Sequence, residues 1–197
     1  GASALTVSPA ASAATWTMGW PLVVGTAQTW SLAANNTLQV NGGLSGSSAL
    51  TVNGAGAVEF ASPSAHSGAL KLESGTVRVL ANNGLGTSAR TVSFYDNAVK
   101  LSFGGDISVD SPVSGTSSGG DVSSNGFSIE PNATVVFNGQ VAMFSQHSIT
   151  LGAGSTMILK GGYSASTSGM SSHLYPKGSG TVVVTNKPFK TGFAVNG

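Results

Sequence analysis

Acidic residues are the first candidates for chemistry in this chain, which has only seven of them among 197 residues. Asp106 and Asp110 lie four positions apart in an alternating stretch, so we expect their side chains on the same face of one strand. Together with Asp121 they could offer carboxylate oxygens to Ca²⁺, which prefers oxygen ligands. The chain has no EF-hand motif and no series of nonapeptide calcium motifs. We therefore expect solvated carboxylates at these positions.

Catalysis by paired carboxylates or by an activated serine is the second possibility. Glycoside cleavage needs two carboxyl groups facing each other in a cleft. Stacking of strands could bring Glu59 and Glu73 together, but nothing in the sequence places them in a cleft. The stretch from Gly115 to Gly119 fits the G-x-S-x-G motif, but it lies in a glycine- and serine-rich segment without the required strand and helix. We predict that the protein is not an enzyme.

Histidines and tryptophans complete the set of candidates. The histidines are His66, His147 and His173. They are far apart without metal-ligand spacing, so we expect ordinary surface residues. The tryptophans, all near the N-terminus, are Trp16, Trp20 and Trp30. They could stack on sugar rings, but we expect them to plug the open end of the fold. The sequence thus predicts no cofactor and no metal.

Composition excludes several classes of partner. Charged residues make up 8 % of the chain, against roughly 25 % in an ordinary domain, and the formal net charge is +1. No basic patch for nucleic acid is evident, because the cations are scattered singly. A hydrophobic content of 40 % argues against disorder. No apolar run is long enough for a transmembrane helix, so we expect no membrane insertion, and the absence of cysteine excludes disulfides.

The elements that must position these residues are short alternating strands that recur along the chain. Clear examples, each with a polar corner in the middle, are residues 70–79, 92–103, 129–137 and 149–159. Alternation gives each strand one buried face. A strand pair that recurs at intervals of about 20 residues is typical of β-solenoids. We predict an all-β protein, a β-solenoid (parallel β-helix) of about eight or nine short coils.

We expect a single solenoid domain with one extension and two loops. The solenoid covers residues 15–197. Residues 1–14 form an N-terminal extension whose strand could be exchanged with another copy. Residues 114–125 and 161–178 are rich in serine and glycine and do not alternate, so we expect them to bulge from the stack as loops. The chain starts without Met, which indicates a processed protein or an excised segment.

One segment, residues 54–86, carries a family resemblance. Its landmarks are, in order, Gly54, Gly56, Val58, Phe60, Ser67-Gly68, Gly75-Thr76 and Leu85-Gly86. This pattern closely resembles the autotransporter-associated β-strand repeat, also called the passenger-associated transport repeat. Residues 25–56 resemble the lead-in to such a repeat, and residues 178–186 resemble a second opening. The resemblance implies a right-handed β-helix that is exported to the bacterial cell surface or beyond.

The ends of the stack are the expected functional surface. A solenoid needs caps at both ends to stay soluble, and the C-terminal end of this chain has no evident polar cap. Alternating apolar residues mark the two ends: Leu5 and Val7, then Phe189, Phe193 and Val195. A free strand at one end and an uncapped stack at the other suit head-to-tail strand addition. We therefore expect a structural subunit of an extracellular bacterial fibre or surface layer, polymerised with copies of itself.

Two other function classes stay open. The chain could be an adhesin or stalk segment of an autotransporter passenger domain. In that role residues 161–178 would contact a host surface or a glycan. A β-helix enzyme acting on polysaccharide is the third class, and it would need a catalytic pair such as Glu59 and Glu73. The first two interpretations place the protein outside the cell or on its surface.

Overall fold

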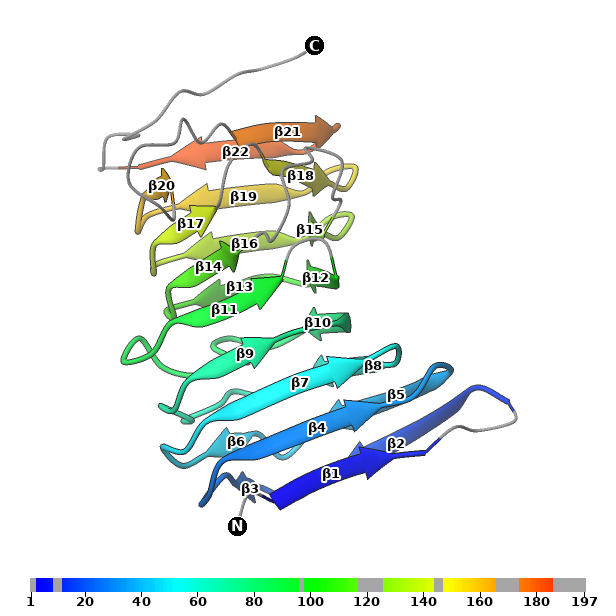
Figure 1. Ribbon diagram of the computed structural model, residues 1–197. Helices are drawn as coiled ribbons and strands as arrows, with labels where there is room; N and C mark the ends of the chain where they lie inside the picture. Colours follow the sequence, from blue (N-terminus) through cyan, green and yellow to red (C-terminus); the bar gives the residue numbers. More distant parts are fainter. Residues whose placement is uncertain are drawn as a thin grey trace.

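The strands of this protein wind into a right-handed parallel β-solenoid. The computed structural model describes residues 3–8, 12–95, 98–116, 126–143, 147–165 and 174–185. Within these ranges the chain forms 22 strands and no helix. The described residues therefore contain no helix that could cross a membrane. Coil is stacked on coil from β1–β3 at one end to β20–β22 at the other (Figure 1). The predicted all-β solenoid is therefore confirmed.

Two long sheets form two sides of the stack, with one strand of each coil in each sheet. Sheet A contains β1 (Ser3–Val7), β4 (Gln28–Leu32), β7 (Leu50–Gly54), β9 (Leu70–Leu72), β11 (Val92–Tyr95), β14 (Val113–Thr116), β17 (Val141–Met143) and β20 (Tyr163–Ala165). Sheet B contains β2 (Ala14–Met18), β5 (Asn36–Val40), β8 (Ala57–Phe60), β10 (Gly75–Val79), β12 (Val99–Phe103), β15 (Phe127–Ile129), β18 (His147–Leu151) and β21 (Leu174–Gly178). Each sheet has eight strands, one from each coil, so the stack has eight coils, and the chain makes about seven full turns from the first coil to the last.

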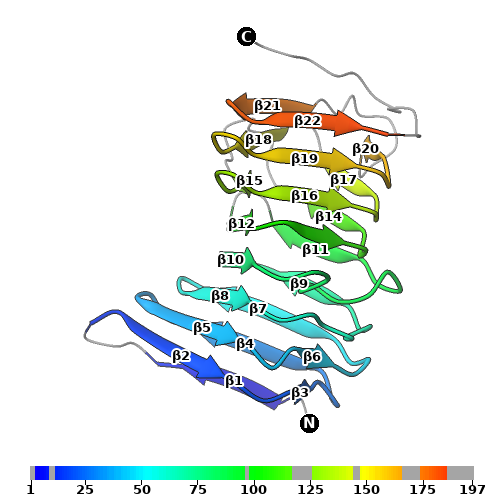
Figure 2. The same cartoon turned by 180° about the vertical axis from the view of Figure 1, so that it is seen from behind.

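The third side of the stack is made of shorter strands and is interrupted (Figure 2). Sheet C consists of β3 (Leu22–Val23) and β6 (Leu44–Ser45). Sheet D consists of β13 (Ile107–Val109), β16 (Thr134–Phe137), β19 (Thr156–Leu159) and β22 (Thr181–Val184). Between the two sheets, in the third and fourth coils, the described chain crosses this side without a strand.

The core consists of columns of apolar side chains that run through the stack. All pairing between strands is parallel, so a residue in one coil lies in register with its counterpart in the next. One such column passes through Leu38, Val58, Val77, Leu101, Phe127 and Ile149 in sheet B. Each of these residues is at most 2 % exposed. The alternation in the sequence is therefore explained, since every second residue of a strand enters a column.

Residues with positive φ turn the chain at the corners. Asn35 and Asn132 adopt φ values of 66° and 58°, a left-handed conformation that asparagine tolerates better than most residues. Gly54 has φ 103°, and a Cβ there would come within 2.1 Å of the carbonyl oxygen of Leu32 in the coil before. Glycine is required at Gly54 on both grounds. Such corners let short coils stack at the usual strand spacing of about 4.8 Å.

The segments expected to lie outside the stack are partly built into it. The N-terminal strand β1 pairs with β4 of the same chain, with Leu5 in register with Trp30, so it belongs to the first coil. The range expected as a loop at 161–178 contains β20 and β21, and the range at 114–125 begins within β14. These strands were missed because each has few large apolar residues, such as Tyr163 and Leu174.

Candidate functional site

The N-terminal end of the solenoid is an open apolar surface. Strands β1 and β2 lie at the ends of sheets A and B, and each pairs on one side only within the described chain. Leu5 and Val7 of β1 and Met18 of β2 are only partly buried. Together with Trp16 and Leu38 they line a cavity of about 630 Å³ at this end. This end therefore combines free strand edges with exposed apolar side chains.

The exposure follows from the lack of a further coil beyond β1 and β2 in the described chain, and not from a polar sequence. Leu5 lies in register with Trp30, and Trp16 lies in register with Leu38. Trp30 and Leu38 are 0 % and 2 % exposed, whereas Trp16 is 54 % exposed. The positions at this end are thus core positions that lack one layer of packing.

The tryptophans do not plug this end as expected. Trp30 is part of the core of the second coil, where its Nε1–H donates to Gln28 Oε1 at 3.1 Å. Trp16 reaches the end surface, and its Nε1–H donates to Asn36 Oδ1 at 3.3 Å. Trp20, in the first coil, is 69 % exposed. A plug requires burial against the first coil, and neither Trp16 nor Trp20 achieves it.

The other end of the stack is different in character. Tyr163 and Leu174 of the last coil are fully buried, while Val182 and Val184 of β22 are partly buried. The residues Phe189, Phe193 and Val195, predicted to act in assembly, lie outside the described residues. The two ends of the solenoid are therefore not equivalent.

Pro176 changes the outer edge of sheet B at this end, where β21 pairs with no further strand in the described part of the chain. Its register partner is Ile149, which places it in an inward-facing column. Inward-facing residues of sheet B donate their N–H to the following coil, as Leu101 N does to Gly126 O at 2.6 Å. At Pro176 that donor is missing, and proline on an edge strand hinders the addition of another strand.

A ladder of polar side chains crosses the outer face of sheet B. Arg78 donates from Nε and Nη2 to the two carboxylate oxygens of Glu130, at 2.5 and 2.7 Å, and its Nη1 lies 3.4 Å from Glu59 Oε1. Gln39 Nε2 donates to Glu59 Oε2 at 2.8 Å. Hydrogen bonding from Arg78 lowers the pKa of Glu130, and the same bond raises the pKa of Arg78. The ladder links the second, third, fourth and sixth coils, and both of its carboxylates accept hydrogen bonds from these side chains.

The carboxylates considered for calcium and for catalysis are not brought together. Asp106 Oδ1 accepts from the backbone N–H of Thr134 at 2.9 Å. Both oxygens of Asp110 accept from amides of Asn83 and Asn138, each at 2.7 Å. Among the described residues no three His, Asp or Glu side chains gather as a metal site, and Asp121 lies outside them.

The possible catalytic pair is also separate. Glu59 belongs to the ladder of sheet B, whereas Glu73 forms an ion pair with Lys71 at 2.8 Å next to sheet A. Gly115 of the G-x-S-x-G motif lies in β14, where a Cβ would contact Phe94 and Met143 in the core. Ser117 of that motif lies outside the described residues. The described groups therefore form no catalytic constellation.

A buried polar cluster fills the gap between sheets C and D. His66 is 0 % exposed and Arg90 is 5 % exposed, and Arg90 Nη1 contacts His66 Nδ1. The expectation that His66 is a surface residue was wrong. The His66 ring contacts Arg90, 24 residues later, and the carbonyl of Ser48. No local sequence pattern therefore predicts that His66 is buried. His147 is a residue of β18, and His173 lies outside the described residues.

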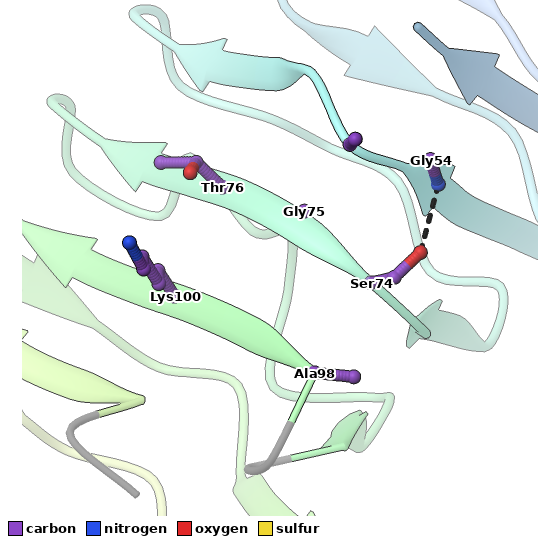
Figure 3. Close-up of a pocket in the computed structure, with 7 residues that line it drawn as sticks. Gly54, Ser74, Gly75, Thr76, Ala98 and Lys100 are labelled. Carbon is purple, nitrogen blue, oxygen red and sulfur yellow. Dashed lines mark hydrogen bonds between the residues drawn. The ribbon is translucent and has the colours of Figure 1, made fainter. Parts of the chain in front are cut away.

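A shallow pocket lies at the corners of the middle coils (Figure 3). It has a volume of about 400 Å³, and Ser74 Oγ accepts there from the N–H of Gly54 at 2.8 Å. Lys100 is its one ionisable group, and Figure 3 shows Lys100 and Thr76 side by side on neighbouring strands. The described side chains that line the pocket include no carboxylate and no imidazole.

Comparisons with protein-family models, with curated proteins and with solved structures give no match. The resemblance of residues 54–86 to autotransporter-associated repeats therefore stays a prediction.

Proposed function

We propose that this protein is a structural subunit of an extracellular bacterial fibre or surface layer, joined head to tail to copies of itself through its solenoid ends. The observation that carries this proposal is the open N-terminal end, where core positions and strand edges face solvent. The extracellular location rests on the repeat resemblance of residues 54–86.

The edges of β1 and β2 are suited to strand addition. Ala14 N donates to Asn35 O of the next coil, so the alternate donors, those of Thr15 and Thr17, point away from the stack. The sequence from Gly1 to Val58 contains no Asp, Glu, Lys or Arg. Charged residues and proline are the usual protection of an exposed edge. β1 and β2 contain neither, which favours pairing with another strand.

The occupant that we propose for this end is the last coil of a second copy. In this contact β20 and β21 of the second copy would pair with β1 and β2 and continue sheets A and B with parallel strands. The columns that start with Trp16 and Met18 end with Pro176 and Gly178, which are smaller. Large side chains at one end would thus meet small ones at the other. Pro176 removes one hydrogen bond from this contact, so side-chain packing must supply most of its stability.

A stalk or adhesin segment is the second candidate, and Pro176 favours it. A proline on the last strand of sheet B weakens the addition of a free copy. In this alternative another coil of a longer chain covers the N-terminal end. Any contact with a host surface or glycan would then come from the lateral faces or from residues 161–178.

Negative-stain electron microscopy with light scattering separates the two candidates. Head-to-tail assembly predicts regular filaments for the unaltered chain and dispersed short rods for Leu5→Asp and Trp16→Asp, because an unpaired carboxylate in the contact is strongly unfavourable. Thr51→Asp on the outer face of β7 is the control and should leave filaments intact. Short rods for the unaltered chain would refute self-assembly and leave the stalk interpretation. A glycan screen would then test adhesion.

A further inference from the structure

The acceptor motif for N-linked sugars, Asn-x-Ser/Thr, occurs twice in the chain. The first copy is Asn35-Asn36-Thr37 and the second is Asn132-Ala133-Thr134. Asn35 follows β4 and Asn132 follows β15, so each motif begins at a corner of the solenoid and ends in the next strand. Both asparagines are exposed. An attached sugar would therefore extend into solvent from either corner, as a bulky modification requires.

The same tight turn places an asparagine at three corners of the stack. In each turn the N–H of the fourth residue donates to the carbonyl of the first, and the third residue is an asparagine with a φ between 53° and 66°. The three asparagines are Asn35, Asn83 and Asn132. Asparagine is favoured at this position because it tolerates a positive φ. The turn explains why asparagine is present, and the side-chain environments show which of the three are available for modification.

The amide side chains of these three asparagines differ in their bonding. Asn83 Nδ2 donates to Asp110 Oδ2 at 2.7 Å, and Asn83 Oδ1 accepts from Asp110 N at 2.9 Å. In the described part of the chain no hydrogen bond involves the side chain of Asn35 or Asn132. The residue two positions after Asn83 is the fully buried Leu85, which has no hydroxyl group. The two asparagines in acceptor motifs are thus the two whose amides are free.

The threonine of each motif lies on the outer side of its strand. Thr37 and Thr134 each precede a core residue, Leu38 and Val135, which are 2 % and 0 % exposed. Alternation along the strand therefore turns both threonine side chains outward. At the second motif the neighbouring coil also leaves space, because a Cβ on Gly154 would come within 2.6 Å of Asn132 Oδ1. An enzyme can thus reach both the amide and the hydroxyl from outside the stack.

We propose that Asn35 and Asn132 are acceptors of N-linked sugar, so that the solenoid carries one glycan at each of these two corners. The donor is a sugar on a diphosphate, which is linked to a nucleotide or to a polyprenyl lipid. Asn Nδ2 forms a bond to the anomeric carbon, and the bond between that carbon and the diphosphate oxygen breaks. The diphosphate leaves with the electron pair, and a base of the transferase takes the amide proton. The sites lie in the second and sixth coils, so the proposal does not depend on assembly through the ends.

The first test is mass spectrometry of the full chain isolated from the cells that produce it. We expect peptides that contain Asn35 and Asn132 to carry hexose or N-acetylhexosamine, and peptides that contain Asn83 and Asn138 to carry none. The absence of sugar from both Asn35 and Asn132 would overturn the proposal.

The second test is transfer of sugar to the purified, folded chain. One arm uses UDP-glucose with a soluble N-glycosyltransferase, and the other uses a lipid-linked oligosaccharide with a membrane oligosaccharyltransferase. Addition at both motifs in either arm supports the proposal and identifies the class of donor, whereas no addition in both arms would contradict it. Thr37→Val and Thr134→Val keep the shape of the side chain and remove its hydroxyl group, so each should lose one addition.

Gln140→Thr is the matched control for the free amide. It creates an acceptor motif at Asn138, which is also exposed but whose Nδ2 donates to Asp110 Oδ1 at 2.7 Å. Because this hydrogen bond to a carboxylate must break first, we expect transfer to Asn138 to be about tenfold slower than transfer to Asn132. Equal rates at the two asparagines would show that a free amide does not select the sites, and would overturn the assignment.

Discussion

Trp16 and Leu38 hold the same position in successive coils, yet Trp16 is 54 % exposed and Leu38 is 2 % exposed. The difference is one layer of neighbours, since Leu38 has a coil on each side and Trp16 has a coil on one side only. A residue of this fold is therefore buried by the coils around it as much as by its own coil.

The first prediction compares these two residues. Leu38→Ala should lower the free energy of unfolding by about 2–5 kcal/mol, as is usual for a buried leucine. Trp16→Ala should cost less in the dispersed protein, because over half of the tryptophan is in water there. Urea denaturation at low protein concentration measures both. If both substitutions destabilise the dispersed protein equally, the N-terminal end is not open.

The second prediction concerns crowding in the core at Gly115. A Cβ there would lie 2.7 Å from Met143 Sδ and 3.1 Å from Phe94 Cζ. Gly115→Val should therefore destabilise the fold by about 1–3 kcal/mol through overpacking. Ser114→Val, at the neighbouring position whose side chain leaves the column, is the control and should have a smaller effect. Chemical denaturation checks both variants, and a stable Gly115→Val would show that this part of the core is loosely packed.

The third prediction concerns acid and the bidentate pair of Arg78 and Glu130. Because the folded pKa of Glu130 is below its ordinary value of 4.5, the pair stabilises the fold above that pH. The contribution is lost as the pH falls through the lower, folded value. Both side chains are partly exposed, so we expect about 0.2–1 kcal/mol. Unfolding of Glu130→Gln and the unaltered chain from pH 7 to pH 3 should show a difference that disappears in acid.

The fourth prediction concerns the neutral, buried His66. Its folded pKa is below the ordinary 6.5, so the unfolded chain binds a proton more readily than the folded chain. Stability is therefore complete above pH 6.5 and declines as the pH falls toward the folded value. His66→Gln can still accept from Arg90 and donate to Ser48, but it does not titrate. Thermal unfolding between pH 7.5 and pH 5 should show a decline in the unaltered chain that is reduced in His66→Gln.

Sequence alternation predicts strands of the two long sheets because these strands obey one rule along the whole stack. Leu70 and Val92 are in register in sheet A, and Ile129 and Leu151 are in register in sheet B. The interval from Val92 to Ile129 is longer than the other intervals between the starts of the predicted strand pairs. It does not measure one repeat, because it joins a strand of sheet A to a strand of sheet B. Sequence spacing alone does not distinguish the sheets.

The candidate sites were harder to predict than the sheets. Leu5 and Val7 are predicted as assembly residues because they alternate, whereas Trp16 and Met18 belong to the same surface through pairing of β2 with β5. The buried polar cluster between sheets C and D depends on contacts between His66, Arg90 and Ser48 across successive coils. Burial of a charged residue through such distant contacts leaves no local pattern.

The single-sided pairing of β1 and β2 has a consequence for how the molecule moves. In a stack where each coil contacts only its neighbours, the free energy of folding is approximately a sum of the stability of each coil and of the contacts between neighbouring coils. The first coil has one neighbour, so its amides should exchange with solvent by fraying, well before the whole solenoid opens. Capture of this end by another coil would stop the fraying. Slower hydrogen exchange in β1 and β2 at higher protein concentration would then report, residue by residue, how the end is occupied.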